Sequence, residues 1–328
     1  MANSTHWAII GTGSIAHKFA TGLKALPAAK LQAVGSRSED RADEFGDEFG
    51  VPDRYDSYEK LAQADEVDVV YVATPHPFHC ENTIRCLEAG KAVLCEKPFA
   101  VNHRQAEEMV RCARDNNLFC MEGMWTRFFP LMDQVRTLLD EGAIGDPRML
   151  QVDFGFRAGW DPDSRLLNPD LAGGSLLDVG VYCTALASMI FGRPFDLTGF
   201  AHLGETGVDE QAAWVFTYEG GELASCSSAV RTNTPMEAVI NGTDGRIRIH
   251  SPWWIPTGMT VEKAEQEPEE MEFPLEGNGM NYEAAAVMHC LQQNRTEHPI
   301  MPLDETLEIA RTMDELRAQW QLKYPFEE

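Results

Sequence analysis

A glycine-rich turn behind the first apolar run constrains the fold of this chain more than any other feature. Trp7-Ala8-Ile9-Ile10 is followed by Gly11-Thr12-Gly13-Ser14-Ile15-Ala16, which has the pattern G-x-G-x-x-A and opens a helical stretch. The first glycine permits a tight turn, the second lets a phosphate approach the backbone, and the small sixth residue lets the helix pack on the strand. Amides at the helix N-terminus then face the phosphates. We therefore predict that a dinucleotide binds here, at Gly11, Gly13, Ser14 and Ile15.

The chain divides into two regions that differ in their pattern of predicted strands and helices. Up to about residue 120, short apolar runs such as 67–73 and 92–95 alternate with helical segments, which indicates a parallel, doubly wound sheet. From residue 149 onward, longer strands are joined by short turns, which indicates an antiparallel sheet. The predicted fold class is α/β, with a Rossmann domain over 1–123 and an α+β domain over 124–328. The last helix, 303–322, is expected to pack back on the first domain.

Two further elements are predicted in the second domain. One helix interrupts the strands, over residues 174–190, and the acidic stretch 262–272 alternates with apolar residues as a solvated edge strand does. One face of the large sheet would be open, and large exposed apolar patches are rare in monomers. We therefore predict a homodimer that forms through this face.

The end of the second strand selects the dinucleotide. An NAD enzyme usually carries Asp or Glu there, which binds the ribose 2′-hydroxyl. This chain has Gly35-Ser36-Arg37-Ser38 instead. Arg37 offers a planar pair of donors to a 2′-phosphate, and Ser36 adds a hydroxyl. The sequence favours NADP over NAD.

Candidate catalytic and cofactor-binding residues follow the later strands. Thr74 and Pro75 end the run 67–73, and Glu96-Lys97-Pro98 ends the run 92–95. Ligands bind at the carboxyl ends of parallel strands, so these residues should contact the cofactor. A tyrosine with a pKa near 10 is a poor base at neutral pH, and a nearby ammonium lowers that pKa. Lys97 and Tyr182 can supply such a pair, and Asp178 lies one helical turn before Tyr182.

Four segments together resemble the glucose–fructose oxidoreductase / inositol dehydrogenase (Gfo/Idh/MocA) family over essentially the whole chain. They are the glycine turn, Ala73-Thr74-Pro75, Glu96-Lys97-Pro98, and Gly173-Gly174-Ser175-Leu176-Leu177-Asp178-Val179-Gly180-Val181-Tyr182. The segments 124–130 and 301–307 are similar to the branch that holds dimeric dihydrodiol dehydrogenase and NADP-dependent D-xylose 1-dehydrogenase.

The resemblance implies a hydride transfer between the nicotinamide and a carbinol or carbonyl carbon of a sugar, polyol or dihydrodiol. It makes Lys97 and Tyr182 the catalytic pair, without deciding which of them moves the proton, and it suggests a cis peptide bond before Pro98. Inositol dehydrogenases have His at the position of Tyr182, which argues against a strict inositol enzyme. Two alternatives stay open: an aldose–aldose oxidoreductase that keeps its NADP bound, and an NADP-binding regulator without turnover.

Other side chains are weaker candidates. Substrate contacts are expected from Trp125, Arg127 and Phe128 after the last Rossmann strand, and from Arg165 in a loop. His79 is a candidate for cofactor binding, although helix capping or polar packing explains it and His76 as well. The roles of Arg157, Trp253, Trp254 and Tyr282 are left undecided.

Composition excludes several classes of partner. Asp and Glu number 52 against 27 Lys and Arg, a formal charge of -25, which argues against nucleic acid and anionic membranes. None of the eight cysteines forms a C-x-x-C pair or a zinc-like set with histidine, so buried reduced thiols and no metal are predicted. No apolar run approaches the roughly 20 residues of a membrane helix, and the N-terminus has no signal-peptide pattern. The cytoplasm is the expected compartment.

Overall fold

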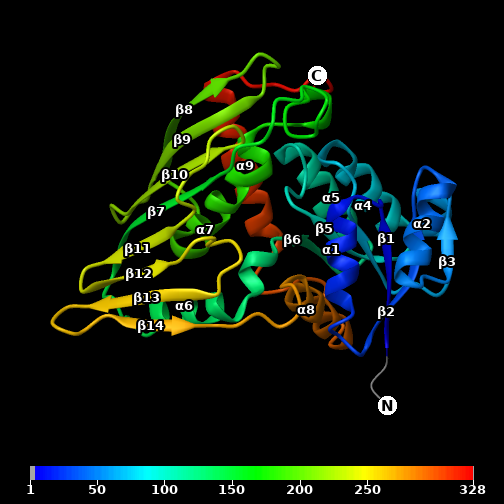
Figure 1. Ribbon diagram of the computed structural model, residues 1–328, viewed down its shortest axis with the longest axis horizontal. Coiled ribbons are helices and arrows are strands. Elements are labelled where there is room, and N and C mark those ends of the chain that lie inside the picture. The colour runs from blue at the N-terminus through cyan, green and yellow to red at the C-terminus, as the bar shows by residue number, and fades with distance from the viewer. Residues whose placement is uncertain (1–3, 328) are drawn as a thin grey trace. The chain divides into compact units, whose positions relative to one another are not determined.

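Six parallel strands form one sheet in the computed structural model of the chain, which describes residues 4–327 (Figure 1). Their order is β3-β2-β1-β4-β5-β6. The order reverses between β1 and β4, which gives the doubly wound arrangement that the sequence predicted. The bounds are β1 (Thr5–Ile10), β2 (Ala29–Gly35), β3 (Asp53–Tyr55), β4 (Val69–Val72), β5 (Ala92–Glu96) and β6 (Cys120–Gly123).

Helices connect these strands, and three of them, the second, third and fifth, have a side-chain cap at the N-terminus. Ser38 caps the second of them, since its hydroxyl accepts a hydrogen bond from the Arg41 amide at 3.4 Å, and Gly50 ends that helix with a φ of 69°. The short strand β3 and the helix that follows it were not predicted, because neither has an apolar period. The helices are α1 (Ser14–Leu23), α2 (Glu39–Phe49), α3 (Tyr58–Ala62), α4 (His79–Glu88) and α5 (His103–Asp115).

The chain leaves this unit and later returns to it. Residues up to Trp125 form the first compact unit together with Leu275–Leu307, and the remaining residues form the second. The returning segment contains α8 (Met280–Gln292), which packs on α1. Helix α9 (Leu303–Trp320) begins in the first unit and ends in the second.

Eight strands form the sheet of the second unit, in the order β14-β13-β12-β11-β7-β10-β9-β8. Every neighbouring pair is antiparallel except β7 with β10, so the prediction of a mostly antiparallel sheet is confirmed. The acidic stretch 262–272, predicted as one edge strand, contains instead the end of β13, a turn and β14, and β14 lies at the edge of the sheet. The bounds are β7 (Pro147–Gly155), β8 (Asp196–Leu203), β9 (Asp209–Thr217), β10 (Leu223–Ala229), β11 (Ala238–Gly242), β12 (Gly245–Ile249), β13 (Gly258–Lys263) and β14 (Glu269–Glu272).

One buried helical segment covers a face of this sheet. A π-helical turn, Leu176–Gly180, leads into α7 (Val181–Phe191), and α7 packs on β7 and β10. Helix α6 (Pro130–Asp140) belongs to the same unit. Contrary to the sequence analysis, Pro169–Phe191 has the length and apolar composition of a membrane span, but 78% of its most apolar window is buried inside the protein. A core helix of a soluble protein has the same properties.

Candidate functional site

The glycine turn has the geometry that a pyrophosphate needs. Gly11 has a φ of +98°, and a Cβ there would lie 2.8 Å from the carbonyl oxygen of Ala73, so only glycine fits. A Cβ on Gly13 would meet nothing within 4 Å, and Gly13 and Ser14 are exposed. No side chain caps the amides at the start of α1. The turn therefore offers free backbone donors in an open cradle.

A hollow of about 360 Å³ lies at the end of β2 in the first unit. The Arg37 guanidinium is exposed at its rim and stands 5.6 Å from the centre of the Phe78 ring. Burial raises the pKa of Tyr58, and the nearby charge of Arg37 opposes that rise. Arg85 also lines the hollow, but it is paired with Glu59 at 3.0 Å and Glu81 at 2.5 Å. The hollow and its exposed cation are a candidate site for the ribose end of a dinucleotide.

His79 joins two strand-end loops. Its Nε2 lies 2.7 Å from the carbonyl oxygen of Thr74, and its Nδ1 lies 2.8 Å from that of Pro98. Burial lowers the pKa of His79 and so favours the neutral ring, which carries one N–H and can donate to one of these oxygens at a time. His79 thus lies between the loops of the two segments that we expect to contact the cofactor.

Buried carboxylates hold the loop that carries Lys97. Glu96 accepts a hydrogen bond from the Lys97 amide at 3.1 Å and another from the Tyr71 hydroxyl, and Glu122 accepts one from the Phe99 amide at 3.1 Å. The Lys97–Pro98 peptide is cis, as the resemblance suggested. The Thr74 hydroxyl is buried and has no hydrogen-bond partner within residues 4–327.

In the second unit, Tyr182, one of the two predicted catalytic residues, follows an ion-paired carboxylate along its helical segment and lies near an aromatic ring. The Asp178 carboxylate is buried and receives the Arg165 guanidinium at 2.8 Å. The Tyr182 side chain is 6% exposed, and its ring centre lies 5.4 Å from that of Phe154. Trp254 stacks on Phe154 with ring centres 3.7 Å apart. Sequence reasoning left Trp254 undecided and missed Phe154, because alternation in a strand does not distinguish a pocket wall from core.

Several other candidate residues are buried or form hydrogen bonds with the backbone. The Trp253 indole is buried and donates to the Asp153 carbonyl at 2.7 Å. Arg127 is also buried, and its guanidinium donates to the Ala185 carbonyl in α7 at 2.6 Å. Trp125 and Phe128 are buried. The Tyr282 hydroxyl accepts the Glu276 amide at 2.9 Å. These contacts favour structural roles for Trp253 and Arg127.

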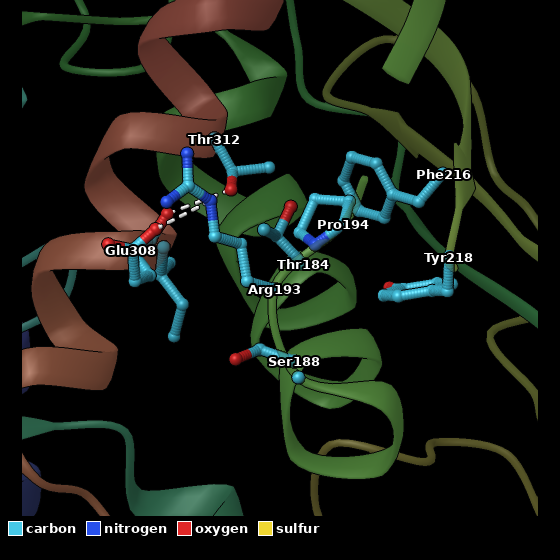
Figure 2. Close-up of a pocket in the computed structure, with 10 residues that line it drawn as sticks. Thr184, Ser188, Arg193, Pro194, Phe216, Tyr218, Glu308 and Thr312 are labelled. Atoms are coloured by element: carbon cyan, nitrogen blue, oxygen red, sulfur yellow. Dashed lines mark hydrogen bonds and ion pairs between the residues drawn. The ribbon is translucent and has the colours of Figure 1, made fainter. Parts of the chain in front are cut away.

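A small cavity lies at the C-terminal end of α7, within the second unit (Figure 2). Its volume is about 10 Å³, space for roughly one water molecule. Arg193 and Glu308 form an ion pair at 3.2 Å beside it. The Tyr218 hydroxyl, which lines this cavity, is buried without a partner in the described part of the chain. The cavity is too small for a sugar or diol substrate.

Neither a disulfide nor a metal centre emerges from residues 4–327. All eight cysteines are free, and most of them are buried. No group of three His, Cys, Asp or Glu side chains within the described range is placed to hold a metal ion.

Comparisons with known proteins agree with this architecture. Residues 5–124 match a family model described as "Oxidoreductase family, NAD-binding Rossmann fold", and residues 132–248 match the "GFO/IDH/MocA C-terminal domain". Trans-1,2-dihydrobenzene-1,2-diol dehydrogenase of Xenopus tropicalis is 38% identical over 332 residues, which cover 98% of this chain and 100% of that protein. The enzyme of that name from Homo sapiens is 37% identical and is covered to 98%, with 97% of this chain matched.

Solved structures with the same fold are also oxidoreductases. An aldose-aldose oxidoreductase from Caulobacter crescentus, complexed with glycerol, has a TM-score of 0.89 and 25% identity, with 97% of this chain and 98% of that chain covered. A 3-ketoreductase from Actinomadura kijaniata, in complex with NADP and TDP-benzene, has a TM-score of 0.85 and 28% identity, with 96% and 98% covered. These similarities support a dehydrogenase that acts on CH–OH groups. The chain belongs to the Gfo/Idh/MocA family of oxidoreductases.

Proposed function

We propose that this enzyme uses NADP to oxidise a secondary or anomeric hydroxyl group of a vicinal diol, either a dihydrodiol or a sugar. The observation that carries the proposal is the ion pair between the buried Asp178 carboxylate and the half-exposed Arg165, four residues before Tyr182, whose ring lies near Phe154 and its stacking partner Trp254. Charged and hydroxyl groups suit substrate hydroxyls, and flat apolar rings suit the C–H face of a sugar or an aromatic diol. The dihydrodiol dehydrogenases and the glycerol-bound aldose enzyme support this substrate class.

The proposed chemistry divides between the residues as follows. A dinucleotide held at the glycine turn would supply the hydride acceptor for the carbinol carbon. The Tyr182 side chain, as a phenolate that the Lys97 ammonium stabilises, takes the proton of the substrate hydroxyl and becomes a neutral phenol. Asp178, with Arg165, orients the substrate through hydrogen bonds. Crystal structures of the 3-ketoreductase include variants of one lysine and of one tyrosine, which is consistent with such a pair.

A substrate panel tests the proposal directly. Purified enzyme is offered dihydrodiols, pentoses, hexoses and simple polyols, each with NADP and with NAD, while the nicotinamide absorbance is followed. We expect turnover of a vicinal diol and a higher kcat/KM with NADP. No turnover of any diol or sugar with either cofactor would contradict the proposal and leave the non-catalytic regulator as the better alternative.

The preference for NADP is expected to depend on Arg37. Arg37→Ala should weaken NADP binding roughly tenfold to a hundredfold and leave NAD binding nearly unchanged, because a charge-assisted contact contributes about 1.5–3 kcal/mol. Arg85→Ala is the matched control, since Arg85 lines the same hollow but is already neutralised by two carboxylates. Fluorescence titration with both cofactors measures the change. Equal losses for NADP and NAD in Arg37→Ala would show that Arg37 only supports the loop.

A second candidate is an aldose–aldose oxidoreductase that retains NADP through both half-reactions. The fold similarity to the enzyme from Caulobacter crescentus favours it. Such an enzyme would copurify with a stoichiometric amount of NADP and would interconvert two sugars without added cofactor.

We further propose a cytoplasmic homodimer that forms through the outer face of the eight-stranded sheet. Phe200 on β8 is 83% exposed, and Met149 and Leu223, paired across β7 and β10, are also exposed on that face. Sedimentation at micromolar concentration should give a dimer, and Phe200→Asp should shift it toward monomer because a charge would be buried. A monomeric parent protein would contradict this assembly.

A further inference from the structure

A buried carboxylate anchors the segment that precedes Asp178 and Tyr182. Asp209 is the first residue of β9 and is fully buried. Its Oδ2 accepts hydrogen bonds from the Leu176 amide at 2.7 Å and from the Ser175 hydroxyl at 2.8 Å. Ser228 on β10 lies 2.8 Å from the same Ser175 hydroxyl. The Leu176 amide has no partner within its own helix, so Asp209 serves as a cap from a distant strand.

The backbone before this contact is shaped around the same carboxylate. Gly174 has a φ of +116°, and a Cβ there would lie 2.1 Å from Oδ1 of Asp209. Glycine is therefore required by both conformation and space. On the other side, the Tyr324 hydroxyl donates to the Gly173 carbonyl at 2.7 Å. Side chains from β9, β10 and the C-terminal segment thus fix four consecutive residues, 173–176.

These fixed residues lead without a break into the π-helical turn and α7. Asp178 lies in that turn, and Tyr182 lies in the first turn of α7. A backbone shift at Leu176 would therefore move both side chains. A displacement of about 1 Å in a reacting group can cost roughly a hundredfold in rate.

The surroundings of Asp209 make the anchor sensitive to pH. Burial raises the pKa of Asp209 to about 6, although the hydrogen bonds from Ser175 and Leu176 oppose that rise. The groups that face it from neighbouring elements are the hydroxyls of Ser175 and Ser228 and the phenol of Tyr324. The nearest cation on that side, Arg317 over the Tyr324 ring, is paired with Glu327 and Asp314. The anchor is thus ionised at neutral pH and protonated at acidic pH.

We propose that Asp209 is a positioning residue for the reaction: its carboxylate holds the N-terminal end of the helical segment that carries Asp178 and Tyr182. This inference rests on the proposed function, in which those two residues bind substrate and transfer the proton. Asp209 itself acts only through the backbone of residues 174–176. Hydrogen bonds to an ionised carboxylate are about twice as strong as those to a neutral acceptor, so the hold is tightest when Asp209 is charged.

The test compares the parent enzyme with Asp209→Asn between pH 5 and pH 8. The amide is neutral at every pH and so resembles protonated Asp209. At pH 8 we expect kcat of the variant to fall roughly tenfold to a hundredfold, with NADP affinity unchanged. The ratio of parent kcat to variant kcat should then shrink as the pH falls through about 6. A purely structural residue would give a ratio that does not change with pH.

Two further measurements distinguish a failure of this inference from a failure of the proposed function. Asp153→Asn removes a part-buried strand carboxylate that accepts the Met236 amide at 2.7 Å, and kcat of this variant should stay within about twofold of the parent at every pH. Hydrogen exchange of the amides of residues 174–182 should quicken in Asp209→Asn but not in Asp153→Asn. A kcat ratio independent of pH, or unchanged kcat with faster exchange, would overturn the inference. A parent enzyme without turnover would instead refute the proposed function, and the exchange rates would still decide whether Asp209 anchors the segment.

Discussion

Tyr182→Phe is expected to lower kcat by roughly 10²–10⁴-fold, because it removes the hydroxyl that we propose as the proton acceptor. The ring would keep its contact with Phe154, whose centre lies 5.4 Å away, so the fold should persist. Steady-state kinetics with the best diol substrate gives the change in kcat. Circular dichroism and NADP titration should match the parent enzyme.

Tyr218→Phe is a matched control for this experiment. Tyr218 is 7% exposed, much as Tyr182 is, and its hydroxyl lines the small cavity at the other end of α7 (Figure 2). Removing that hydroxyl should leave kcat within about twofold of the parent. If Tyr182→Phe also stayed within twofold, Tyr182 would not transfer the proton, and Lys97 or Asp178 would have to do so.

Lys97→Met should abolish most of kcat while NADP still binds, because the glycine turn is unchanged. The ammonium group stabilises the phenolate in our proposal, so the kcat/KM profile for oxidation should rise through an apparent pKa that shifts upward or vanishes in the variant. Lys91→Met, at the opposite end of β5, is the control. Lys91 donates to the Val67 carbonyl at 3.1 Å, and its loss should leave the pH profile intact.

The double variant tests whether Lys97 and Tyr182 act as a unit. Residues that share one step are not additive, so the double variant should be little slower than the slower single variant. Multiplied losses would mean that the two side chains contribute independently. In that case the lysine would help through cofactor or substrate binding, and KM rather than kcat would change in Lys97→Met.

The sequence predicted the parallel sheet well because its strands are buried on both faces. Val69–Val72 and Ala92–Glu96 are buried at every position, and an uninterrupted run of mostly apolar residues identifies such strands directly. The edge strand Asp53–Tyr55 has no such run and was missed. In the second sheet, the parallel pairing of β7 with β10 joins residues about 70 positions apart, and no local pattern encodes it.

The sequence identified candidate catalytic residues that lie within motifs more readily than the residues whose hydrogen bonds position them. Lys97 and Tyr182 stand out in the sequence because their neighbours form recognisable motifs. Asp209 and Glu122 are acidic residues within strands, and the sequence does not reveal that each accepts a backbone amide from another element. Trp254 is similar: its stacking on Phe154 depends on a contact across 100 residues. Such contacts are set by tertiary packing, which local periodicity does not contain.

The return of the chain to its first unit has a consequence for synthesis. The parallel sheet ends at Gly123, but α8, which packs on α1, follows only at Met280–Gln292. During translation the nucleotide-binding unit would therefore lack α8 until the whole eight-stranded sheet has emerged from the ribosome. Domains usually fold in order from the N-terminus, and exposed apolar surface on an unfinished domain favours aggregation. Here the part of α1 around Gly22, which lies against Met280 and Asn281, would stay uncovered until residue 292 has been made.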